Sequence, residues 1–107
     1  MKTLTDIYIN QDKAIEWGLG LECAVIYEFL SKLEFWAGNI YCENTNKDWY
    51  GIEVEEVVKS LPLLNLSISS VFDCYDYMDC SGIMEYSEVK GEGVILLNKD
   101  KLDEWHS

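Results

Sequence analysis

Ser67 opens a run of three local signals that together predict a helix followed by a β-hairpin. Ser67 itself is a good helix N-cap, and Gly82 is the expected end of the helix that it begins. The next segment, IMEYSEV, alternates apolar and polar residues, which is typical of a half-buried strand. A Gly-Glu-Gly turn follows, and VILLN forms the returning strand.

The N-terminal third is predicted to be mostly helical. The segment DIYIN is expected to be a short strand or an extended arm, after which Asn10 can cap a short helix ending at Gly18 or Gly20. From Leu21 to Trp36 the apolar residues recur with a 3.6-residue period, which predicts an amphipathic helix. Its polar residues are expected to face water: Glu22, Glu28, Lys32 and Glu34.

The middle of the chain and its tail carry shorter signals. In IYCENTNKDWYGI the central ENTNKD has turn chemistry, so a small hairpin or a loop followed by a strand is expected. A helix is predicted from about Glu53 to Ser60, with Pro62 just beyond its end and three glutamates, Glu53, Glu55 and Glu56, in its first turn. Asn98 can cap one or two helical turns in the tail NKDKLDEWHS.

Chain length and hydropathy predict one soluble domain spanning residues 1–107. No stretch approaches the roughly 18 apolar residues of a membrane span, and the first residues do not resemble a signal peptide. We therefore expect a cytoplasmic protein. Four cysteines without any CxxC spacing are expected to remain reduced: Cys23, Cys42, Cys74 and Cys80.

Charge is the most informative part of the composition. Twenty acidic residues against eight basic ones give a net charge of −12, and all eight basic residues are lysines. Arginine is the residue best suited to bidentate contact with phosphate and guanine. A chain without arginine is therefore a poor candidate for a duplex-DNA-binding protein.

The order of the expected elements resembles a winged helix, in particular the N-terminal winged-helix domains of phage and plasmid replication proteins from low-GC bacteria. Three stretches carry the resemblance: IYINQDKAIEWGLGLECAVIYEFL, DWYGIEVEEVVKSLPLLNLS and SSVFDCYDYMDCSGIMEYSEV. The resemblance implies an α+β fold, mostly α, with a helix-turn-helix and a small β-hairpin wing. It also implies that the helix beginning at Ser67 is the recognition helix.

In that frame Val71, Tyr75 and Met78 would face inward, and five residues would face the groove of a bound DNA: Ser69, Ser70, Asp73, Asp76 and Tyr77. The family would carry Arg or Lys at several of these outward positions. Here residues 60–89 contain no basic residue, whereas they contain five acidic ones: Asp73, Asp76, Asp79, Glu85 and Glu88. Because phosphates would be repelled, the sequence disfavours DNA binding through this helix.

Two interpretations of the acidic helix remain open. Either the helix is a scaffold whose acidic residues are merely solvated, or its acidic face imitates DNA and occupies a basic nucleic-acid-binding cleft on another protein. Helical residues three apart lie about 5–6 Å apart, close to the spacing of successive phosphates. Asp73, Asp76 and Asp79 form such a series, and Tyr77 and Tyr86 are expected beside it.

The small, acidic, arginine-free composition is similar to phage-encoded anti-CRISPR proteins and other DNA-mimic inhibitors. This similarity implies a basic nucleic-acid-binding partner, such as a CRISPR effector, and a location in the host cytoplasm if a phage encodes the chain. The candidate partner-binding residues are Ser69, Ser70, Asp73, Asp76, Tyr77, Asp79, Glu85 and Tyr86. Whether the glutamates of the helix at 53–60 belong to the same surface stays open.

The same residues bear on other functions. The alternative function is a replication- or transcription-linked winged-helix module that binds DNA or a protein through another face. Self-association through Trp36 and the long helix would give a homodimer. An enzyme is not expected, because His106 is the only histidine and no nucleophile–base pattern is present. No cofactor or metal is expected either.

Overall fold

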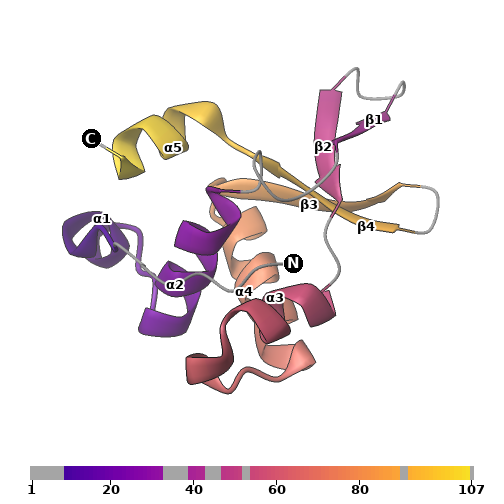
Figure 1. Ribbon diagram of the computed structural model, residues 1–107. Coiled ribbons are helices and arrows are strands. Elements are labelled where there is room, and N and C mark those ends of the chain that lie inside the picture. Colours follow the sequence, from indigo (N-terminus) through magenta and orange to yellow (C-terminus); the bar gives the residue numbers. More distant parts are fainter. Residues whose placement is uncertain (1–8, 33–38, 43–46, 52–53, 90–91, 107) are drawn as a thin grey trace.

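A computed structural model describes residues 9–32, 39–42, 47–51, 54–89 and 92–106 (Figure 1). These residues form an α+β fold that is mostly helical, as the sequence predicts. The elements in chain order are α1 (Gln11–Glu16), α2 (Leu21–Leu30), β1 (Asn39–Cys42), β2 (Lys47–Gly51), α3 (Val54–Ser60), the 3-10 turn η2 (Pro62–Leu64), α4 (Ile68–Cys80), β3 (Met84–Val89), β4 (Glu92–Leu97) and α5 (Lys99–Trp105). Among them no helix is long and apolar enough to cross a bilayer.

The second helix is shorter than its hydropathy pattern predicts. Helix α2 ends at Leu30, whereas the prediction extended it to Trp36. The side chain of Ser31 donates a 2.6 Å hydrogen bond to the carbonyl of Glu28, and the amide of Lys32 bonds to the carbonyl of Phe29. These short-range bonds tighten the last turn and end the helix. Residues 33–36 of the prediction, and most of the expected N-terminal arm, lie outside the described residues.

Glu28 is buried, which corrects the expectation that it faces water. The residue is 4 % exposed, and its side chain accepts a 3.1 Å hydrogen bond from the indole nitrogen of Trp105. The Trp105 ring stacks on Trp17 and packs edge-on against Tyr27, with ring centroids 5.6 Å and 5.0 Å apart. This aromatic cluster holds α5 against α1 and α2, and Figure 1 shows the three helices at one end of the molecule. The hydrogen bond from Trp105 and the Lys32 ammonium, 3.8 Å away, offset part of the free-energy cost of burying this carboxylate.

The strands form one antiparallel sheet in the order β1-β2-β4-β3. The hairpin predicted for residues 83–98 is present as β3 with β4, and of the two alternatives for the middle segment the structure has the hairpin, formed by β1 with β2. The sheet is nevertheless larger than the small two-stranded wing that the resemblance implies, because Tyr50 and Gly51 of β2 pair with Ile95 and Val94 of β4. That pairing joins residues more than forty positions apart, which local sequence patterns do not reveal.

Helix α4 has the boundaries that the sequence predicts. The Ser67 side chain accepts a hydrogen bond from the amide of Ser70 at its start, and Gly82 follows its end with a φ of +75°. Val71, Tyr75 and Met78 are all fully buried, which confirms them as the inward positions. Their side chains pack with buried residues of α2 and α3 in the hydrophobic core, which lies against the inward side of α4.

Cys74 of α4 is a fourth buried position of this helix and meets α2. Its thiol interacts with the thiol of Cys23, and this neighbour lowers the pKa of Cys23 and raises that of Cys74. Cys23, Cys74 and Cys80 are free thiols, as predicted, and the side chain of Cys42 lies outside what the structure describes.

Candidate functional site

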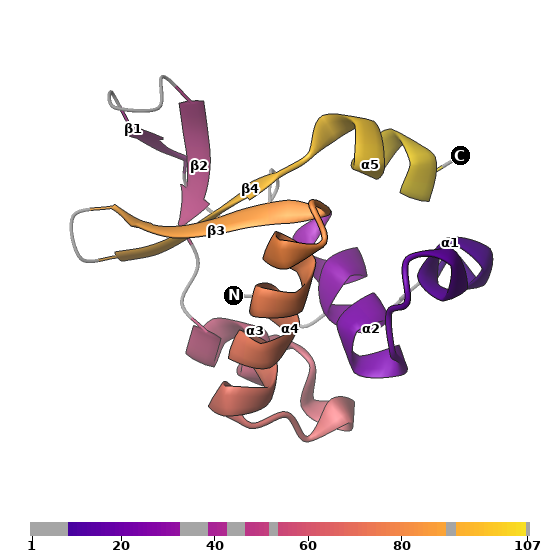
Figure 2. The ribbon, with the colours of Figure 1, turned by 180° about the vertical axis from the view of Figure 1, so that it is seen from behind.

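The outward side of α4 carries an acidic face formed by Asp73, Asp76 and Asp79. All three side chains are exposed, and none forms a salt bridge with any residue that the structure describes. Figure 2 shows α4 on the near side of the molecule, directly beside β3. The buried side of the helix packs on the core, so the acidic face lies on a rigid support rather than on a loop.

The acidic face winds around α4 rather than following its axis. Each residue advances the helix by about 100°, so a step of three residues shifts a side chain by about 60° around the axis. Asp73 and Asp79 therefore differ by about 120° in direction. Asp79 consequently lies beside the β3–β4 hairpin. Asp73 and Asp76 are exposed away from that junction, and we call the side of α4 that carries them its open side.

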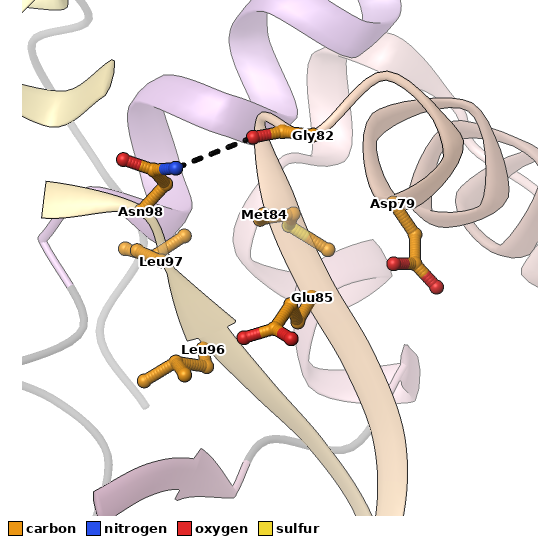
Figure 3. A pocket seen from close by; sticks show the side chains of 7 residues that line it. All are labelled: Asp79, Gly82, Met84, Glu85, Leu96, Leu97 and Asn98. Carbon is orange, nitrogen blue, oxygen red and sulfur yellow. Dashed lines mark hydrogen bonds between the residues drawn. The ribbon is translucent and has the colours of Figure 1, made fainter. Parts of the chain in front are cut away.

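Asp79 borders a hollow of about 440 Å³ where α4, β3 and β4 meet. We call it the terminal hollow, and Figure 3 shows the seven residues that line it: Asp79, Gly82, Met84, Glu85, Leu96, Leu97 and Asn98. Asp79 comes from α4 and Glu85 from β3. Both border the hollow, but their carboxylates lie on opposite sides of β3 and point away from one another (Figure 3). The Asn98 side chain donates a 3.5 Å hydrogen bond to the carbonyl of Gly82 and links the end of α4 to the end of β4.

The two candidate tyrosines lie on different sides of α4. Tyr77 is 41 % exposed, and its hydroxyl donates a 2.8 Å hydrogen bond to the carbonyl of Trp17 in the turn after α1. Tyr86 is half-buried, with its ring 6.1 Å from that of Phe72 and 5.2 Å from that of Tyr75. Tyr77 therefore ties α4 to the α1–α2 turn, and Tyr86 packs β3 against α4.

The candidate serines belong to the start of α4. The hydroxyl of Ser67 lies 3.3 Å from that of Ser69 and 2.9 Å from that of Ser70. Together with the bond from the Ser70 amide to Ser67, these contacts make a capping cluster. Ser69 is exposed and Ser70 is half-buried, at the opposite end of α4 from the terminal hollow.

An exposed apolar pair on α4 was not singled out from the sequence. Ile68 and Phe72 are 45 % and 38 % exposed, and they lie one helical turn apart. The sequence could have indicated this pair, because the two apolar residues are four positions apart and neither is one of the predicted inward positions. Both residues flank the acidic face, so the outward surface of α4 combines carboxylates with apolar side chains.

Two lysines on α1 and α5 form ion pairs with glutamates of the same helix. Lys13 lies 2.8 Å from Glu16, and Lys101 lies 3.7 Å from Glu104, on the helices α1 and α5. The hydrogen bond between the two side chains lowers the pKa of Glu16 and raises the pKa of Lys13. These charges compensate one another, so α1 and α5 do not form a purely basic patch there.

Within the described residues no group of three His, Cys, Asp or Glu side chains could hold a metal ion. Of the glutamates on the third helix, Glu55 is exposed and Glu56 is half-buried, and neither lines the terminal hollow. Comparison with known proteins found no family model, no curated protein and no solved structure that matches the chain. The function is therefore inferred from the charge, exposure and shape of the α4 surface.

Proposed function

We propose that the chain is a winged helix in which α4 occupies the place of the recognition helix and β3 with β4 forms the wing. The succession of α3, the η2 turn and α4, followed directly by a hairpin, supports this assignment. The burial of Val71, Tyr75 and Met78 also agrees with it, because a recognition helix keeps one side on the core. The pairing of β2 with β4 enlarges the wing into a four-stranded sheet.

The protein acts as a small inhibitor, of the kind that phages and mobile elements encode, which binds a basic nucleic-acid-binding protein by imitating DNA. One observation carries this proposal. Asp73, Asp76 and Asp79 stand exposed in succession on the supported outward side of α4 and have no salt bridge within the described part of the chain. The net charge of −12 gives the whole protein the sign of a nucleic acid.

The mechanism is competitive occlusion. A nucleic-acid-binding cleft places lysines and arginines where phosphates lie, and neutralising each phosphate releases counterions that contribute to affinity. Carboxylates spaced about 5–6 Å apart along α4 can occupy those positions. A CRISPR effector is a suitable target class, because such effectors hold nucleic acid in a positively charged channel and read a short DNA motif with arginines.

The first test replaces the two open-side carboxylates in the full chain, Asp73→Lys with Asp76→Lys. Both side chains are exposed and without salt bridges to described residues, so the variant is expected to fold with the circular dichroism spectrum of the parent. Immobilised parent protein should capture a basic nucleic-acid-binding protein from host lysate at low salt, and release it at high salt. The double variant should capture none of that protein, which is identified by mass spectrometry and then tested in purified form.

The matched control is Glu22→Lys with Asp103→Lys, two exposed carboxylates on α2 and α5. It changes the net charge by the same amount and should retain most of the capture. Equal loss in both variants would mean that net charge, and not the face of α4, recognises the partner. Binding of a labelled DNA duplex to the parent protein would contradict mimicry outright.

A second candidate is a replication- or transcription-linked winged-helix module that binds DNA or a protein partner through another face. The observation in its favour is the exposure of Ile15 and Leu21, which are 78 % and 69 % exposed near the α1–α2 turn. A protein partner that covered these two side chains would remove their apolar surface from water. Under this alternative the Asp73→Lys, Asp76→Lys variant keeps its partner, and Ile15→Ser with Leu21→Ser loses it.

A further inference from the structure

We propose that Cys23 and Cys74 form a redox-active pair, in which a hydroperoxide oxidises Cys23 and Cys74 then closes a disulfide between α2 and α4. This inference concerns a modification site and does not rest on the inhibitor function proposed above. Its basis is that the fold brings two thiols together from distant parts of the chain. Cys23 comes from the first turn of α2, and Cys74 comes from the middle of α4.

The two thiols are held together by the packing of their helices. Helices α2 and α4 lie against each other, and the Cys23 and Cys74 thiols interact across this contact (Figure 2). Cys74 is buried in the hydrophobic core, and Cys23 packs against that core from α2. One turn further along α4, the Tyr77 hydroxyl bonds the carbonyl of Trp17, just before α2, and fixes the same helix contact. Because both thiols lie on packed helices, the pair is positioned before any oxidant arrives.

The two cysteines differ in their access to solvent. Cys23 is half-buried, so a small oxidant can reach its sulfur from water, whereas Cys74 is buried. Cys23 also lies in the first turn of α2, where the partial positive charge of the helix N-terminus favours a thiolate. Cys23 is therefore the thiol that meets the oxidant, and Cys74 is the thiol placed to react with the product.

The interaction between the thiols supports the same assignment of roles. The neighbouring Cys74 thiol lowers the pKa of Cys23, and this effect outweighs burial and the Glu22 carboxylate, which both act in the opposite direction. The neighbouring Cys23 thiol and burial raise the pKa of Cys74, with smaller contributions from Glu22 and Asp73. Since the thiolate is the nucleophile, Cys23 reacts first.

The oxidation proceeds in two balanced steps, written here for hydrogen peroxide. The Cys23 thiolate attacks one oxygen of the peroxide, the O–O bond breaks, and the departing hydroxide becomes water with the proton that Cys23 had released. The Cys74 sulfur then attacks the sulfur of the Cys23 sulfenic acid. The S–S bond forms, the S–O bond breaks, and the departing hydroxide takes the Cys74 proton. In total the two thiols lose two hydrogens and two electrons, and the peroxide is reduced to two molecules of water.

The disulfide is expected to stabilise the fold. A cross-link between Cys23 and Cys74 closes a loop of about half the chain, which restricts the unfolded chain more than the folded one. The oxidised protein should therefore unfold at a higher urea concentration than the reduced protein. Reduction of the disulfide should return the midpoint to its starting value.

The test treats the full chain carrying Cys80→Ser with hydrogen peroxide, blocks the remaining thiols by alkylation and digests the protein with trypsin without reduction. Cleavage after lysine places Cys23 in residues 14–32 and Cys74 in residues 60–90. The exposed Cys80 is replaced so that the second peptide contains one cysteine. Mass spectrometry should find these two peptides joined, with two hydrogen atoms fewer than their sum, in a protein with the intact mass of one chain. Dithiothreitol should separate them.

Further variants in the same background separate the two roles. Cys74→Ala removes the second thiol, so the sulfenic acid on Cys23 should persist and be trapped by dimedone in residues 14–32. Cys23→Ser changes a half-buried position and should give neither the cross-link nor the dimedone adduct. Its urea midpoint should not respond to peroxide. Cys42→Ser leaves the pair intact and should form the cross-link as the parent does.

Several results would overturn the proposal. One is that Cys23 and Cys74 both remain thiols at a peroxide concentration that oxidises free cysteine in the same time. Others are a cross-link that joins two chains or involves Cys42, and sulfinic acid on Cys23 without any cross-link to Cys74. A peroxide-induced rise in the urea midpoint of Cys23→Ser, equal to that of the parent, would also overturn it. Circular dichroism shows whether each variant has kept its fold, and Cys23→Ser decides the outcome if the buried change Cys74→Ala unfolds the chain.

Discussion

The hydroxyl of Tyr77 donates a 2.8 Å hydrogen bond to the backbone carbonyl of Trp17, sixty residues earlier in the chain. This bond connects α4, which carries the acidic face, to the turn between α1 and α2. We expect Tyr77→Phe to lower the free energy of unfolding by about 0.5–1.5 kcal/mol, toward the lower end because the bond is exposed. Urea denaturation measures the change, and an unchanged midpoint would mean that the bond contributes nothing to stability.

The same contact constrains Gly18, whose φ is +71°. A β-carbon at this position would lie 2.6 Å from the Tyr77 hydroxyl oxygen, so Gly18→Ala meets both a clash and an unfavourable backbone conformation. Gly82→Ala meets only the conformation, since its φ is +75° and its surroundings are open. Gly20→Ala meets neither. We expect the free energy of unfolding to fall by more than about 1 kcal/mol for Gly18→Ala and by about 1 kcal/mol for Gly82→Ala. For Gly20→Ala we expect a change close to zero.

Thermal denaturation of the three glycine variants tests this order. Gly82→Ala and Gly20→Ala act as the controls for backbone strain and for the substitution itself. Combining Gly18→Ala with Tyr77→Phe should recover part of the loss, because the phenyl ring has no hydroxyl in the way. Equal decreases in stability for Gly18→Ala and Gly82→Ala would show that the Tyr77 side chain moves aside without loss of stability.

The buried carboxylate of Glu28 depends on the indole of Trp105. Trp105→Phe keeps an aromatic ring but removes the donor, so we expect a loss of about 1–3 kcal/mol in the free energy of unfolding. Glu28→Gln is the matched variant, because its side-chain oxygen still accepts the bond and no charge is buried. It should cost less than Trp105→Phe in the same denaturation experiment, and the reverse order would contradict the role assigned to the indole.

Stability should fall in alkaline solution because two tyrosine hydroxyls are buried. Burial raises the pKa of Tyr27 and of Tyr75 above their ordinary value of 10.0. Below about pH 10 both states keep the protons, whereas above it only the unfolded chain releases them. The free energy of unfolding should therefore fall by up to about 1.4 kcal/mol per pH unit for each tyrosine.

Urea denaturation across this pH range, with phenolate absorbance recorded in parallel, checks the prediction. Tyr75→Phe is the control, because it removes one titrating group. Among the described residues the Tyr75 hydroxyl has no hydrogen-bond partner, so this variant should be neutral or stabilising near neutral pH. Phenolate formation with an ordinary midpoint in the folded protein would show that these hydroxyls are accessible to solvent.

The parts of the fold that were predictable are those encoded over a few residues. Ser67 and Gly82 mark the ends of α4 because capping and a positive φ are properties of single positions. The alternation in residues 83–89 predicted β3 for the same reason. The acidic face followed from helical spacing, since Asp73, Asp76 and Asp79 need only the helix itself to lie outward.

Only the tertiary structure decided which distant residues meet. Glu28 carries the same charge as its exposed neighbour Glu22, yet it is buried because Trp105, 77 residues away, supplies a donor. The pairing of β2 with β4 and the placement of Asp79 and Glu85 at the border of the terminal hollow likewise depend on how the elements pack. The sequence alone determined where the helices start, most of the turns and the sign of the charge, because these depend on neighbouring residues, whereas the end of α2 at Leu30 was not predicted. The tertiary structure determined the shape of the candidate site, because it depends on contacts whose geometry no local pattern contains.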